Sequence, residues 1–175
     1  MEEVVRGFLK DWIGHRLLLH GTFYSEESRT SGRSPMQIDG IVYDPHRGPV
    51  VLREGGFAVV HPGFCTSVVE IKTSFSPPLM KFRERLSEIH ERYMHHVMKL
   101  QVMGIVIVDK DAEAKSVMEW PSGERIHAYY YQHSGWHPMF VLFSEKDGEY
   151  RPHVPAIEAM IRAVFTMQYG GNNLL

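Results

Sequence analysis

Residues 65–75, CTSVVEIKTSF, predict a β-strand in which two charges interrupt a β-branched run. Successive side chains on a strand point to opposite faces, so Glu70 and Lys72 share one face. Val69 and Ile71 share the other. Burying an unpaired charge costs several kcal/mol or forces the group to neutralise. The two neighbouring charges therefore need a partner, an opening to solvent or a chemical role.

Length and composition indicate a single domain. At 175 residues with 43% hydrophobic content, the chain can bury one sizeable core but is too short for two ordinary domains, so we expect one domain over 1–175. The 19 Lys and Arg against 21 Asp and Glu give a net charge of -2. This balance excludes a uniformly basic surface for nucleic acid, although a local basic surface is still compatible with it.

Cysteine usage and the N-terminal sequence predict a soluble cytoplasmic protein. Cys65 is the only cysteine, so no intrachain disulfide and no thiolate metal cluster can form. We expect its thiol to be buried and inert. The opening residues MEEVVRGFLKDWIG contain no apolar run of signal-peptide or membrane length, so we expect no membrane partner.

Hydrophobic periodicity predicts an alternation of helices and strands. We expect helices over 2–13 and 77–101, and the unbroken β-branched run at 102–109 is typical of a strand covered on both faces. The remaining predicted elements are strands over 16–25, 36–45, 47–64 with a turn at Gly55–Gly56, 65–75, 125–132 and 137–145, and a last helix over 154–169. This order predicts an α/β fold with a mixed central sheet flanked by helices.

Two of these helices carry apolar residues at helical spacing, which predicts the faces that they bury. For the first helix these residues are Val4, Val5, Phe8, Leu9, Trp12 and Ile13, and for the second they are Leu79, Phe82, Leu86, Ile89, Tyr93 and Val97.

Two acids lie in apolar surroundings on strands that we expect to be neighbours. Asp39 and Glu70 would repel each other at close range unless a proton or a cation lay between them. Oxygen ligands from carboxylates, a backbone carbonyl and water suit Mg²⁺ or Mn²⁺, and the carbonyl of Ile71 is a candidate third ligand. Lys72 would then lie beside the metal, where its ammonium could orient an attacking water or offset phosphate charge.

With these residues, the sequence resembles the PD-(D/E)XK nuclease superfamily, whose restriction-endonuclease-like core runs αβββαβ. Asp39 matches the signature acid on the second strand, and Glu70-Ile71-Lys72 matches the (D/E)-x-K of the third. The resemblance implies a metal-dependent nuclease that hydrolyses DNA, with RNA as a further substrate class. Asp39, Glu70 and Ile71 would be metal ligands, and Lys72 and Glu2 would complete the catalytic set.

Within that superfamily, the chain resembles a family of uncharacterised bacterial and phage nuclease-like domains. Glu2 matches a helical Glu of that family, and Ser34 and Gln37 match an S-x-x-Q-I-D segment that opens the second strand. The resemblance covers residues 2–108 and leaves 109–175 as a C-terminal extension of a β-pair and a helix. A homodimer is compatible with this function, because a symmetric pair of sites matches the symmetry of duplex DNA.

Other interpretations of the charged strand stay open at this level. A second E-x-K triplet, Glu113-Ala114-Lys115, lies in a polar stretch that we expect to be exposed. The triplet alone therefore does not indicate a site, and only its position in an apolar strand distinguishes Glu70-Ile71-Lys72. Glu70 and Lys72 could instead form a structural ion pair, or belong to a decayed site that keeps the fold. The alternative function is then a catalytically inactive module that binds nucleic acid or protein.

Histidines of the second long helix provide a competing signal for a metal site. His95 and His96 are sequence neighbours and His90 lies well round the helix from them, so we do not expect the three imidazoles to face one cation. We expect a solvated or phosphate-facing helix surface instead.

Overall fold

The computed structural model describes residues 2–14, 16–24, 34–74, 80–93, 100–109, 118–119, 125–126, 128–132 and 136–169. The helices are α1 (Glu2–Trp12), α3 (Met80–Tyr93), α4 (Val154–Tyr169) and the short 3-10 helix η1 (Pro62–Phe64). The strands are β1 (Leu17–Phe23), β2 (Ile38–Tyr43), β3 (Leu52–Glu54), β4 (Phe57–Val60), β5 (Cys65–Lys72), β6 (Gln101–Asp109), β7 (Met118–Glu119), β8 (Arg125–Ile126), β9 (Ala128–Gln132), β10 (Trp136–Lys146) and β11 (Glu149–Pro152).

The strands form a mixed central sheet, as predicted. Its order is β11-β10-β6-β5-β2-β1-β4-β3, with β9 paired to β10, while β7 and β8 form a separate pair. β5, β6 and β10 run parallel to one another, whereas β2 runs antiparallel to both β1 and β5. The structure thus confirms the α/β class and the helix–strands–helix–strand order of the predicted core.

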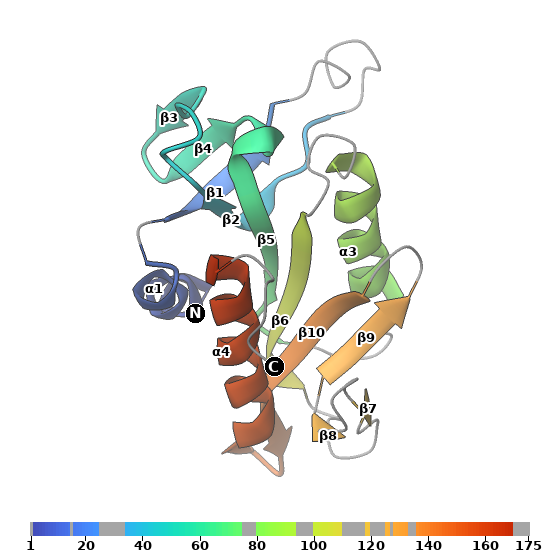
Figure 1. The fold of residues 1–175 in the computed structure, drawn as a ribbon. Coiled ribbons are helices and arrows are strands. Elements are labelled where there is room, and N and C mark those ends of the chain that lie inside the picture. The colour runs from blue at the N-terminus through green and yellow to red at the C-terminus, as the bar shows by residue number, and fades with distance from the viewer. Residues whose placement is uncertain are drawn as a thin grey trace.

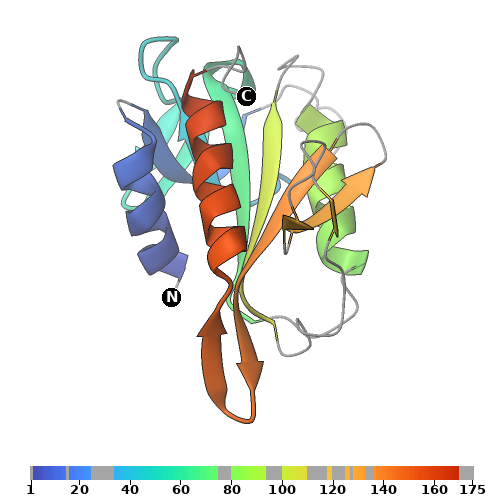
Figure 2. The same cartoon turned by 60° about the horizontal axis from the view of Figure 1, so that its bottom comes forward.

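Helices cover both faces of this sheet. α1 and α4 lie side by side on one face, and α3 covers the other (Figures 1 and 2). Each face has its own hydrophobic cluster, so β5 and β6 are buried between two layers of helices. A strand covered on both faces must be apolar on both, which explains the unbroken β-branched run of β6.

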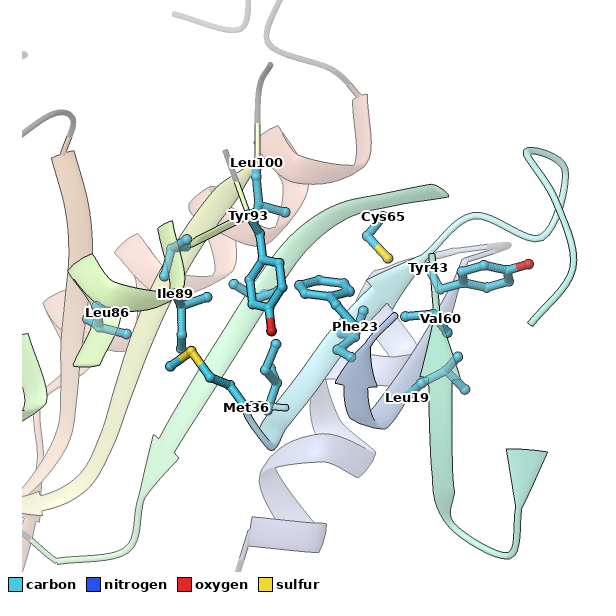
Figure 3. Close-up of a cluster of buried hydrophobic side chains, with 14 of the residues drawn as sticks. Leu19, Phe23, Met36, Tyr43, Val60, Cys65, Leu86, Ile89, Tyr93 and Leu100 are labelled. Carbon is cyan, nitrogen blue, oxygen red and sulfur yellow. The ribbon is translucent and has the colours of Figure 1, made fainter. Parts of the chain in front are cut away.

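The cluster under α3 contains the residues of that helix that we expected to be buried. Phe82, Leu86, Ile89 and Tyr93 are each at most 3% exposed, and the Tyr93 ring meets Phe23 of β1 edge-on with ring centroids 4.5 Å apart (Figure 3). Such pairs add about 0.5–1.5 kcal/mol beyond the area that they bury. This contact ties α3 to the strand on the far side of β2.

Cys65 belongs to the same cluster, which confirms the expected buried thiol (Figure 3). Its Sγ lies 3.6 Å from the carbonyl oxygen of His61, to which the thiol donates. Burial raises the pKa of the Cys65 thiol, so the nucleophilic thiolate is disfavoured.

The buried stripe of α1 is narrower than predicted. Val5, Leu9 and Ile13 are buried at spacings of four residues, whereas Val4 is 69% exposed and Phe8 38% exposed. Six apolar residues span a wide arc of a helix, but it is the i, i+4 and i+8 row, with the partly buried Trp12 beside it, that packs into the cluster. The prediction that Val4 and Phe8 face the core is therefore wrong.

The second long helix also differs from its predicted bounds. Gln101, which we expected at the end of this helix, is instead the first residue of β6, where it pairs with Ser67 of β5. The helical pattern and the β-branched run adjoin at Gln101, so the sequence fits either element there. Pairing with β5 places Gln101 in the strand. Residues 75–79 and 94–99, which include the predicted helix start, Leu79, Val97, His95 and His96, lie outside the described residues.

The C-terminal third extends the central sheet. β9 and β10 pair antiparallel, which matches the predicted β-pair, and β10 is inserted parallel beside β6. The division of the chain into a core of residues 2–108 and an extension stays a prediction, as does the single domain. None of the helices in the described ranges is long and apolar enough to cross a membrane.

Candidate active site

The two candidate metal-binding acids lie on neighbouring strands. Gly40 of β2 pairs with Val69 of β5, and this antiparallel register places Asp39 beside Glu70. The expectation that Glu70 and Ile71 lie on opposite faces also holds, because Val68 belongs to the cluster under α3 and Ile71 to the cluster under α1 and α4. The side chains needed for the site thus come from the ends of two central strands.

A pocket of about 540 Å³ opens where these strands end. Its lining includes the five predicted site residues, which are Glu2, Asp39, Glu70, Ile71 and Lys72. The structure therefore brings together all five, although it assigns no chemical role to any of them. Further lining residues are Gln37 from the chain before β2 and Lys81, Phe82 and Arg85 from α3.

Asp39 is held by the backbone of the neighbouring strand. Its Oδ2 accepts a hydrogen bond of 2.9 Å from the N–H of Ile71, and the side chain is half-buried. A backbone N–H in a sheet is rigid, so this bond fixes the orientation of the carboxylate at the pocket.

Glu70 is a buried acid with an incomplete set of partners. It is 5% exposed, and its Oε1 is buried without a hydrogen-bond partner in the described part of the chain. Its ion-pair partner is Arg85, whose Nη2 lies 3.7 Å from Oε1. A buried carboxylate oxygen that accepts no hydrogen bond is costly for the folded chain, so a ligand that satisfied it would be bound favourably.

The pKa of Glu70 reports this environment. Burial and the nearby Asp39 raise the pKa of Glu70 to about 7, against the opposing effects of Arg85, Lys72 and a backbone hydrogen bond from Asp39. Two carboxylates at close range favour a cation between them. Glu70 thus holds a proton up to a higher pH than an ordinary glutamate, unless a cation binds.

Lys72 and Glu2 approach the pocket from different elements. Lys72 ends β5 and is exposed, with its Nζ 6.0 Å from the centroid of the Phe82 ring. Glu2 lies in the first turn of α1, where its Oε2 is 3.8 Å from the Nη1 of Arg6. The same Nη1 donates to the carbonyl oxygen of Asp39 at 3.5 Å, so Arg6 links α1 to β2 beside the site.

Arg6 and Arg85 were not among the predicted site residues. Both lie on helices rich in mixed charges, and such a pattern is also typical of an ordinary solvated face. The sequence signal that could have found them is a spacing of four residues, which places two side chains on one face of a helix. Arg6 stands in this way to Glu2, and Arg85 to Lys81, and both Glu2 and Lys81 line the pocket.

The two residues that open the second strand differ in position. Gln37 lines the pocket, and its side-chain Nε2 lies 3.0 Å from the Nε2 of His20. Ser34 does not line the pocket, and its carbonyl oxygen accepts a hydrogen bond of 3.2 Å from Arg92. Residues 25–33 and Glu113-Ala114-Lys115 lie outside the described residues.

The donors at this pocket fit a hard divalent cation. Among the described residues there is no group of three or more His, Cys, Asp and Glu side chains that could hold a metal ion. Mg²⁺ is commonly held by one or two carboxylates and otherwise by water and phosphate oxygens. The unpartnered Oε1 of Glu70, on the strand beside Asp39, agrees with that pattern.

Comparison with known proteins supports the architecture. No family model and no curated protein matches the sequence. Among solved structures, NucC of E. coli MS115-1 in its cAAA-bound form matches with a TM-score of 0.56 at 13% identity, covering 97% of this chain and 77% of that one. The chain has the NucC fold.

Two further NucC structures agree with this result. NucC of P. aeruginosa ATCC27853, cAAA-bound, has a TM-score of 0.56 at 11% identity over 97% of this chain and 78% of that one. The apo form of the E. coli NucC has a TM-score of 0.54 at 14% identity over 97% and 83%. With the order of helices and strands, the likeness to NucC shows a restriction-endonuclease-like fold, while the uncharacterised bacterial and phage family stays a prediction.

Proposed function

We propose that the chain is a metal-dependent nuclease that hydrolyses phosphodiester bonds of DNA, with RNA as a further substrate class. The observation that carries the proposal is the buried, unpartnered Oε1 of Glu70 beside Asp39, at a pocket that Lys72 also lines. The restriction-endonuclease-like fold supports it, and Asp39 and the Glu70-Ile71-Lys72 triplet lie on strands that pair with each other, β2 and β5.

In this proposal, each residue has a role that follows from its position. Asp39 and Glu70, with the carbonyl of Ile71, would hold Mg²⁺ or Mn²⁺, which supplies Lewis-acid activation of water and phosphate oxygens. Lys72 would orient the attacking water and offset negative charge as it develops on the phosphate. Glu2 would contact water at the outer side of the pocket, because it comes from α1 and not from the sheet.

The contacts of Glu70 disfavour the inactive-module alternative. One form of that interpretation needs Glu70 and Lys72 to form a structural ion pair, but the ion pair that the structure gives Glu70 is with Arg85. Lys72 is exposed at the end of β5. A surface lysine contributes little to stability in such a position.

The test compares Mn²⁺ binding by the parent and by Asp39→Asn. Asparagine keeps an oxygen that can accept the Ile71 N–H, so the fold should survive while the negative charge is lost. By isothermal titration, we expect Mn²⁺ affinity to fall about tenfold or more, which is about 1.4 kcal/mol per factor of ten. We also expect Mn²⁺ to raise the melting temperature of the parent and not of the variant.

Cleavage is then measured on supercoiled and single-stranded DNA and on RNA, with Mg²⁺ or Mn²⁺. Because two NucC structures are described as cAAA-bound, each assay is run with and without cAAA. Asp44→Asn is the matched control, since Asp44 directly follows β2 and bonds the N–H of His46 outside the pocket. Metal binding and cleavage that survive equally in Asp39→Asn would refute the proposal.

A further inference from the structure

Arg85 is the positive side chain that lies nearest the buried acid of the site. Its Nη2 is 3.7 Å from the Oε1 of Glu70, which is longer than a hydrogen bond. The same nitrogen instead donates to the carbonyl oxygen of Gln37. Arg85 therefore balances the charge of Glu70 without satisfying its oxygen.

The position of Arg85 is set by groups other than Glu70. Besides the carbonyl of Gln37, its Nη1 lies 4.0 Å from the Oε2 of Glu88, one turn further along α3. These contacts hold the guanidinium at the pocket, and its side chain is 30% exposed. A guanidinium has five N–H donors in a planar fork, so donors are left over for an anion that enters the pocket.

Arg85 and a bound cation would both interact with the carboxylate of Glu70. A divalent cation between Asp39 and Glu70 would supply the charge that Arg85 supplies in its absence, and it would repel the guanidinium. Because Gln37 and Glu88 keep Arg85 at the pocket wall, the fork would stay there with its donors directed to other acceptors. A phosphate oxygen is the acceptor that suits a planar, bidentate donor.

We propose that Arg85 is a substrate-contacting residue, which balances Glu70 before the metal binds and contacts the phosphate of the nucleic acid afterwards. This inference rests on the proposed nuclease function. Its alternative is that Arg85 only anchors α3 to the chain before β2, as a structural residue would.

Arg92 on the same helix provides a matched control for that alternative. It also donates to a backbone carbonyl before β2, that of Ser34, and its Nη2 lies 3.1 Å from the Oε1 of Glu88. Arg92 does not line the pocket. Arg92→Gln thus removes a similar anchor without removing a pocket charge.

The experiment measures Mn²⁺ affinity, kcat and KM for Arg85→Gln, Arg85→Lys and Arg92→Gln. For Arg85→Gln we expect cleavage to fall about 10²–10³-fold, as when one charge-stabilising donor is removed. We expect its Mn²⁺ affinity to equal or exceed that of the parent, because a competing positive charge is gone. Arg85→Lys should recover part of the loss, and Arg92→Gln should cleave like the parent.

The sign of the change in Mn²⁺ affinity separates the two roles. If Arg85 only anchored α3 to the chain before β2, Arg85→Gln would loosen the pocket and lower Mn²⁺ affinity, and Arg92→Gln would lose cleavage to a similar extent. Either that result or full cleavage by Arg85→Gln would overturn the role of Arg85 while leaving the nuclease function intact. A parent that neither binds Mn²⁺ nor cleaves any nucleic acid would overturn both.

Discussion

Replacing Lys72 should change the cleavage rate strongly and the stability of the fold very little. It is exposed at the end of β5, so its side chain contributes little to the packed core. For Lys72→Ala we expect cleavage to fall about 10²–10³-fold, with Mn²⁺ affinity retained and the melting temperature within about 2 °C of the parent. Initial cleavage rates and thermal unfolding check this.

A second exposed lysine is the control for that variant. Lys10→Ala removes an exposed positive charge from the last turn of α1, outside the pocket, and should leave cleavage unchanged. A Lys72→Ala protein that cleaves as fast as Lys10→Ala would count against the proposed mechanism.

Among single residues, the acids of the site were easier to predict from the sequence than the arginines that contact them from the helices. Asp39 and Glu70 are identifiable because a charge inside an apolar strand is unusual and needs an explanation. Arg6 and Arg85 lie on helices where charges are common, and only the packing of α1 and α3 against the strand ends reveals their contacts. The distance from Arg85 to Glu70 depends on how the helix docks, which no local pattern encodes.

Among the elements, β1 depends on a glycine at its contact with β4. Gly21 pairs with Ala58 in the parallel β1–β4 ladder, and a Cβ at Gly21 would lie 1.8 Å from the carbonyl oxygen of Ala58. The contact is with backbone, so it cannot be relieved by a side-chain rotation. For Gly21→Ala we expect the free energy of unfolding to fall by about 3 kcal/mol or more, measured by urea denaturation.

Gly7 is the opposite case and serves as the control. It lies inside α1, is exposed, and a Cβ there would have no neighbour within 4 Å. Alanine is favoured over glycine inside a helix by about 0.5–1 kcal/mol, so Gly7→Ala should stabilise the protein by that amount. A destabilised Gly7→Ala protein would contradict the described environment of α1.

Elements were more predictable than their arrangement. Periodicity located α1, α4, β2, β5 and the Gly55–Gly56 turn between β3 and β4, because each signal lies within a few residues. The insertion of β10 beside β6 depends instead on pairing between distant segments, such as Phe140 with Ile105. An apolar run fits a central or an edge position equally well until its neighbour is known.

For the whole molecule, a buried histidine beside a half-buried one makes stability depend on pH. His137 of β10 is 3% exposed, and its ring centroid lies 4.6 Å from that of His90 on α3. Burial, and the neighbouring His90, lower the pKa of His137 from 6.5 to about 4. Between these values the unfolded chain binds a proton that the folded chain does not, so stability falls as the pH is lowered through this window.

Replacing His137 tests this linkage. We expect the loss of unfolding free energy between pH 7 and pH 4.5 to be smaller in His137→Gln than in the parent, by about 1–2 kcal/mol. Urea denaturation at a series of pH values measures both slopes. Equal slopes in the two proteins would show that His137 does not titrate as its burial implies.

The side-by-side packing of α1 and α4 has a consequence for the order in which the protein is made. α1 is synthesised before α4, yet the two helices lie side by side (Figure 2), and Leu9 of α1 and Met160 of α4 belong to one hydrophobic cluster. The apolar face beneath them is therefore incompletely covered until α4 has been synthesised. During that time, chaperones and competing chains can reach the face on which Ile71 lies.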